Sequence, residues 1–258
     1  MLDAIIGIIV MLIPFLLMFL FLALVVGILG TIAYFWAKNF IKARNETMEY
    51  CEKNGLVFSE HLQFGFPNEC KNFKITKKGR QRTFYFVVSG KRENIDFAVM
   101  NYRYTDEEPY RESTFLGMKV KTRSGGRNKA PEYQATLCML TLDNLNMPHF
   151  FIRDESFIMD SLGKLVGGQD INFAEDPAFS KKFVLQGENE SEIRTFFNSK
   201  VRSAFVNFHK KGFVYEAVGK YLFVFSPNNC EEIEKKMQFL ADSVKFVPAL
   251  TSSDSDKI

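Results

Sequence analysis

The chain has 258 residues, a formal net charge of +3 and 24% charged side chains. That length suffices for one large or two small domains behind a membrane segment. Its cysteines form no C-x-x-C pair and stand near no run of histidines, which argues against a zinc or redox motif and favours free thiols of a reducing compartment. They are Cys51, Cys70, Cys138 and Cys230.

Residues 1–37 carry one charged side chain, Asp3, and the apolar run then continues unbroken to Lys38. The run exceeds the roughly 20 apolar residues that a helix needs to cross a bilayer. A signal peptide would start with positive charge and end in small residues, whereas this run ends in aromatic residues. A buried core helix of this length would reach about 50 Å and would need a polar face. We therefore expect an uncleaved, single-pass transmembrane anchor over residues 1–37.

The residues that flank the run predict its orientation. Three basic side chains follow it, while only Asp3 and the α-amino group precede it. By the positive-inside rule the N-terminus lies outside and the soluble part is cytoplasmic. Two aromatic residues stand where an interfacial aromatic belt is expected. The predicted membrane-interface anchor consists of Tyr34, Trp36, Lys38, Lys42 and Arg44.

Small residues recur every four positions within the run, at Ala23, Gly27 and Thr31. Such a stripe lets two membrane helices approach each other closely. Small residues are also common in membrane helices that stay single, so a homodimer through this helix is one of two open alternatives.

The next stretch predicts a helical stalk and then antiparallel strands. Residues 41–54 have helical composition and Gly55 is placed to end the helix. β-Branched and aromatic residues predict a hairpin of strands 82–89 and 95–104. A second strand pair is expected from 118–123 and 133–142, followed by a short strand at 149–152.

After residue 189 the apolar residues recur at the spacing that is typical of amphipathic helices. Asn189 with Glu192 predicts a helix cap, and this helix is expected to end at Gly212. A tight hairpin about Gly219 follows, and Asn229 with Glu232 predicts the cap of a second helix ending near Val244.

This order of elements predicts an α+β fold: a single N-terminal transmembrane helix followed by a soluble domain of antiparallel hairpins and two amphipathic helices. The expected parts are the anchor (1–37), a juxtamembrane helical stalk (38–55), a cytoplasmic α+β domain (56–250), which could divide near residue 144, and a disordered tail (251–258).

The net charge hides a basic stretch, because residues 71–92 contain no acidic side chain. Lys and Arg near an anionic leaflet are each attracted by about 1 kcal/mol. Solvated strand faces are the alternative interpretation. Nucleic acid is the least favoured partner, since the interleaved aromatic residues alternate like core residues and no RNA-binding consensus is present. The predicted anionic-surface residues are Lys74, Lys77, Lys78, Arg80 and Arg82.

Catalytic signals are thin, because the G-x-S-x-G, H-E-x-x-H and phosphate-loop motifs are all absent. Carboxylates at Asp154, Glu155 and Asp170 could together hold a hard cation for metal-assisted hydrolysis. The favoured interpretation is that Asp154 starts a turn or helix and that Asp170 is a turn residue after Gly167 and Gly168. No metal site and no cofactor are predicted, and an enzyme is the less favoured class.

Four segments carry a resemblance to known proteins: FFIRDES (150–156), GGQDINF (167–173), DPAFSKKFVLQGENE (176–190) and YLFVFSP (221–227). The region 149–246 resembles a segment of uncharacterised bacterial membrane-anchored proteins. The resemblance implies a bacterial inner-membrane protein with a folded module, and it supplies no catalytic residue. The expected function is a membrane-anchored binding or scaffold domain that contacts anionic lipid or a protein partner. The alternative is a membrane-tethered metal-dependent hydrolase that uses the carboxylates around Asp154 and Asp170.

Overall fold

The computed structural model describes residues 2–62, 65–77, 80–105, 110–115, 118–123, 132–155 and 170–251. The chain forms two compact units, Met1–Glu46 and Thr47–Ile258. Each unit is considered by itself below. The predicted disordered tail lies outside the described residues except for Thr251, which ends the last helix.

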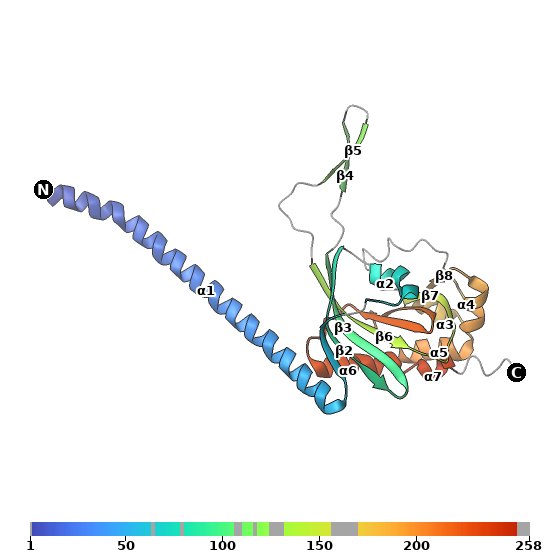
Figure 1. The fold of residues 1–258 in the computed structure, drawn as a ribbon. Helices are drawn as coiled ribbons and strands as arrows, with labels where there is room; N and C mark the ends of the chain where they lie inside the picture. The colour runs from blue at the N-terminus through green and yellow to red at the C-terminus, as the bar shows by residue number, and fades with distance from the viewer. Residues whose placement is uncertain are drawn as a thin grey trace. The chain divides into compact units, whose positions relative to one another are not determined.

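The first unit lies within one long helix, α1 (Leu2–Asn54), coloured blue in Figure 1. Consecutive large side chains such as Phe19, Leu20 and Phe21 are exposed, and consecutive helical residues point to different sides. The part of the helix before Lys38 is therefore apolar all round, as expected for a helix in hydrocarbon. Among the described residues it is the one helix long and apolar enough to cross a membrane.

The last turns of α1 belong to the second unit. Thr47 and Cys51 are buried there, and Tyr50 packs against the core of that unit. Gly55 ends the helix with a φ of +64°, a left-handed conformation that glycine adopts without strain. The helix thus continues unbroken through the predicted stalk.

An antiparallel sheet of eight strands organises the second unit, in the order β1-β2-β3-β6-β10-β9-β7-β8. It joins strands from both sides of residue 144, and the predicted α+β class is confirmed. The strands are β1 (Val57–His61), β2 (Arg80–Arg92), β3 (Ile95–Thr105), β6 (Glu132–Thr141), β7 (Met147–Asp154), β8 (Phe183–Gly187), β9 (Val214–Gly219) and β10 (Tyr221–Ser226).

Two predicted hairpins are confirmed and one predicted pairing is wrong. Strands β2 and β3 turn at Glu93 and Asn94, both with positive φ, and β9 and β10 turn at Gly219. The segment 118–123, however, forms β5 (Met118–Arg123) and pairs with β4 (Tyr110–Phe115). Strand β4 is closer in sequence to β5, so their pairing closes a shorter loop. Strand β6 lies between β3 and β10 instead.

The first predicted amphipathic helix is two helices, so the expectation of two such helices is corrected. Asn189 caps the first of them through the Glu192 amide, as predicted. Asn198 then caps a new helix by accepting from the Val201 amide, which breaks the run. The helices are η1 (Asn68–Asn72), α2 (Lys74–Lys77), α3 (Pro177–Lys182), α4 (Glu190–Phe196), α5 (Ser199–Phe208), α6 (Ile233–Val244) and α7 (Val247–Thr251).

The predicted cap of the last long helix is also wrong. Glu232, rather than Asn229, occupies the N-cap position of α6. The Asn229 amide instead donates to Gln134 on β6, and its oxygen accepts from Asn101 on β3. The residue therefore ties the loop before α6 to two neighbouring strands.

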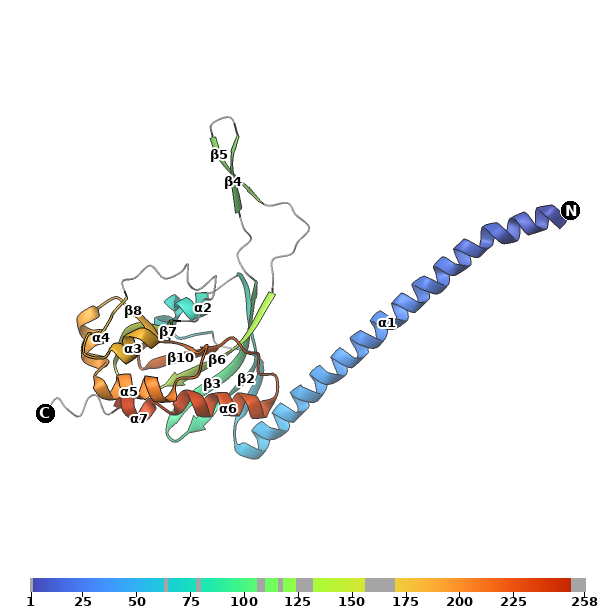
Figure 2. The same cartoon turned by 180° about the vertical axis from the view of Figure 1, so that it is seen from behind.

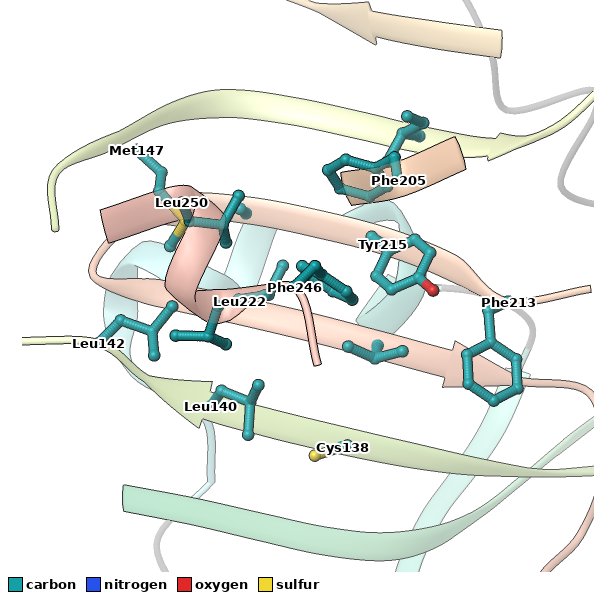
Figure 3. Packing of buried hydrophobic residues seen from close by; sticks show 14 of the residues in the cluster. Cys138, Leu140, Leu142, Met147, Phe205, Phe213, Tyr215, Leu222, Phe246 and Leu250 are labelled. Carbon is teal, nitrogen blue, oxygen red and sulfur yellow. The ribbon is translucent and has the colours of Figure 1, made fainter. Parts of the chain in front are cut away.

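Alternating side chains place a core on each face of the sheet. Leu222 and Val224 of β10 join the core under α3–α7, whereas Phe223 and Phe225 join the core under η1 and α2. Figures 1 and 2 show α2 on one side of the sheet and α5–α7 on the other. Phe246 packs on Tyr215 of β9 with ring centroids 5.1 Å apart (Figure 3).

Candidate functional site

A buried carboxylate on β9 forms the centre of the candidate site. The Glu216 side chain has no exposed surface. Its Oε2 accepts a hydrogen bond from the Ile75 amide at 2.9 Å, and its Oε1 accepts one from the Lys74 amide at 2.8 Å. Both amides belong to the start of α2, so Glu216 fixes this short helix on the sheet.

His149 on β7 supplies the other partner of Glu216. Its Nε2 lies 3.3 Å from Glu216 Oε1, and its Nδ1 lies 3.3 Å from Oε1 of the exposed Glu188. The ring stacks on Phe73 with centroids 5.7 Å apart. The hydrogen bond to Glu216 raises the pKa of His149, while burial opposes that rise. A protonated His149 ring therefore places positive charge beside the buried carboxylate.

Lys74 joins the same network and is only partly available to solvent. Its Nζ donates to Gln186 Oε1 at 3.4 Å and lies 5.1 Å from the centre of the Phe151 ring. Burial lowers the pKa of Lys74, and Glu216 opposes that change. The Gln186 amide donates in turn to Asp170 Oδ1 at 2.7 Å. Two residues predicted for different sites, Lys74 and Asp170, are therefore joined through Gln186.

Three of the other predicted anionic-surface residues are exposed beside this network, and so is Lys71, which was not among those predicted. Lys71, Lys77, Arg80 and Arg82 are all exposed, and we call these four residues the basic edge. Arg82 Nη1 donates to the Thr76 carbonyl at 2.9 Å, which holds the end of α2 against the start of β2. Lys78 lies outside the described residues.

Asp154 occupies a different site, at the end of β7. Its Oδ2 accepts from the Gly212 amide at 2.7 Å. Its Oδ1 lies 2.8 Å from Nε2 of His209. Burial lowers the pKa of His209, and Asp154 opposes that change. Glu155 is exposed.

The carboxylates predicted for a hydrolase do not form one site. Asp154 bonds to Gly212, whereas Asp170 bonds to Gln186, which lies opposite Phe151 on the other face of the sheet. Within the described ranges, no three His, Cys, Asp or Glu residues gather as metal ligands. The positions of Asp154 and Asp170 therefore give no support to the alternative of a hydrolase in which they share a metal ion.

The predicted membrane-interface residues lie on α1. Tyr34 and Trp36 are exposed, and Trp36 stacks on Phe40 with centroids 6.0 Å apart. Lys38 and Lys42 are exposed and Arg44 is half-buried. A Cβ added at Gly27, in the small-residue stripe, would meet no atom within 4 Å.

The comparisons with known proteins find little. No protein-family model matches the sequence, and no curated protein matches it. One solved structure is similar, the crystal structure of the mycobacterial trehalose monomycolate transport factor A, TtfA. The identity is 9% and the TM-score 0.47, over 82% of this chain and 93% of that chain. At that distance the likeness carries no argument about activity.

The substitution Glu216→Gln tests the network under α2. The glutamine side chain has one acceptor oxygen for the two backbone amides of Lys74 and Ile75. We therefore expect the free energy of unfolding to fall by about 1–3 kcal/mol. The pKa of His149 should also fall, because its main partner loses its charge. Urea denaturation and an NMR titration of His149 measure the two effects.

Glu188→Gln is the matched control, because it removes only the exposed partner of His149 and should change stability little. A raised pKa in the folded state means that His149 stabilises the fold below its unfolded pKa of about 6.5, and that this contribution is lost as the pH rises through the folded pKa. Equal urea midpoints for Glu216→Gln and the wild type would contradict this account.

The contribution of His209 to stability should depend on pH in the opposite sense to that of His149. Its folded pKa is lowered, so its contribution is present above the unfolded pKa of about 6.5 and is lost as the pH falls through the folded pKa. We expect His209→Gln to lose less stability than the wild type when the pH is lowered through this range. Urea denaturation at several pH values measures this. The exposed His61→Gln is the control and should follow the wild type, whereas parallel curves for His209→Gln and the wild type would refute the assignment.

Proposed function

We propose that this protein is a single-pass protein of a bacterial inner membrane, with a cytoplasmic binding module that contacts anionic lipid headgroups through the basic edge. Two observations support the membrane part. Helix α1 is long enough and apolar enough to cross a bilayer, and Lys38, Lys42 and Arg44 follow its apolar run. By the positive-inside rule, these basic residues support a cytoplasmic position of the folded unit.

The observation that carries the lipid proposal is the basic edge itself. Four exposed basic side chains lie on η1, α2 and the start of β2, and the Arg82–Thr76 hydrogen bond joins the last two elements. At about 1 kcal/mol for each Lys or Arg near an anionic surface, the basic edge would contribute a few kcal/mol of attraction.

The short link in α1 makes this contact feasible. The stretch from Lys38 to Glu46 would span only about 30 Å even if it were fully extended. A folded unit on so short a link stays close to the headgroups, where local concentration favours weak electrostatic binding. A fixed surface of several positive charges is then sufficient for function without a deep lipid pocket.

Vesicle co-sedimentation of residues 45–258 tests the proposal, since residues 47–258 form a compact unit with their own core. We expect binding to phosphatidylglycerol vesicles that fades at high salt, and none to phosphatidylcholine vesicles. Combined reversal of Lys77, Arg80 and Arg82 to Glu should weaken binding at least about tenfold.

The matched control reverses three exposed lysines elsewhere, Lys53, Lys220 and Lys235, and should bind more tightly than the basic-edge variant. Circular dichroism first establishes that each protein is folded. Equal binding to both kinds of vesicle, or equal losses in the two variants, would contradict the proposal. Absence of binding to either vesicle would direct the search to a protein partner.

A further inference from the structure

Three lysines and a buried histidine line a pocket that is separate from the network around Glu216. The pocket has a volume of about 590 Å³ and is lined by Asp154, Glu155, Lys181, Lys182, His209 and Lys211. Lys181 and Lys182 come from the last turn of α3, and Lys211 follows α5. Two elements therefore supply the positive charge.

The carboxylates of this pocket do not neutralise its lysines. Asp154 is engaged by Gly212 and His209, and Glu155 is the other acid of the lining. In the part of the chain that the structure describes, no carboxylate forms an ion pair with Lys181, Lys182 or Lys211. Three lysines against two carboxylates give the lining a net charge of +1 when His209 is neutral.

The lysines also differ in how firmly they are held. The Lys182 ammonium donates to the Val206 carbonyl at 2.7 Å, so its position is restrained. An ammonium group has three donors, and a restrained lysine can keep one bond to the protein while the others contact a ligand.

His209 gives a second, independent sign of a ligand. Its side chain is 1% exposed and its Nε2 lies 2.8 Å from Asp154 Oδ1, yet its Nδ1 has no hydrogen-bond partner among the described residues. Buried polar groups in proteins are nearly always hydrogen-bonded. Burial lowers the pKa of His209, and an anion placed in the pocket would favour the protonated ring.

We propose that this pocket binds a phosphate group, carried either by a small phosphorylated molecule or by a lipid headgroup. Lysines bind phosphate as point charges without a fixed planar geometry, and several of them match an oxyanion that carries more than one charge. The proposal is independent of the lipid contact at the basic edge, because the two sites share no residue.

The test uses the full chain in an uncharged detergent, with inorganic phosphate as the probe and chloride at matched ionic strength as the reference. Calorimetric titration should show saturable phosphate binding. The double variant Lys181→Ala, Lys211→Ala should bind at least about tenfold more weakly. NMR should show that phosphate raises the pKa of His209, a response that a purely structural histidine would not give.

Lys210→Ala is the matched control, because it removes the neighbouring lysine, whose Nζ lies 3.9 Å from Asp242. It should bind phosphate as the wild type does, and so should the basic-edge variant. Phosphate binding that is unchanged in the double variant would overturn the proposal, and so would equal effects of phosphate and chloride if the phosphatidic acid of the second arm does not bind either. Melting curves without phosphate verify that the variants are folded.

A second arm replaces phosphate with short-chain phosphatidic acid to identify the source of the group. Binding of both probes with the same lysine dependence assigns the pocket to phosphate on any carrier. Binding of phosphatidic acid alone, again lost in the double variant, assigns it to a headgroup. Binding of neither probe would overturn the proposal.

Discussion

The buried charge of Glu216 is the constraint on which the candidate lipid-binding surface depends. A carboxylate in the core is tolerated only when it is paired and hydrogen-bonded. The partners here come from segments distant in sequence: the amides of Lys74 and Ile75, and the ring of His149. The hydrogen bonds to Glu216 therefore hold α2, and η1 before it, against the sheet. This position of the two helices exposes the basic edge beside them.

A second buried polar side chain, Lys236, joins a helix to the sheet on the face opposite α2. Lys236 on α6 is fully buried and donates to the Phe86 carbonyl at 3.0 Å, and burial lowers its pKa to about 8. Phe86 has a positive φ at an irregularity of the β2–β3 pairing. The lysine thus bonds to a carbonyl at this irregularity and ties α6 to β2.

Local signals in the sequence predict much of this fold. The unbroken apolar run identifies α1, Glu93–Asn94 and Gly219 mark two hairpins, and Asn189 marks a helix start, because each of these features depends on neighbouring residues. The break before Asn198 has a local signal too, since asparagine is a good cap within an otherwise helical run. A prediction that follows only the spacing of the apolar residues misses this break.

The order of the strands and the composition of the sites depend on contacts distant in sequence. Strand β6 pairs with β10 across most of the domain, and no local pattern specifies that neighbour. The pairing of His149 with Glu216 follows from β7 lying beside β9, so it too escapes sequence reasoning. A glutamate in the apolar strand of residues 214–219 is the available signal, because a buried carboxylate requires a partner.

Hydrogen–deuterium exchange on the full chain in nanodiscs tests the central claim most directly, because it locates the contact while the anchor is in place. Discs of phosphatidylcholine are compared with discs that also contain phosphatidylglycerol. The account predicts that anionic lipid slows exchange in η1, α2 and the start of β2 and leaves α5 and α6 unchanged. Identical exchange in the two discs, or slowing confined to other elements, would contradict the claim that the basic edge contacts the membrane.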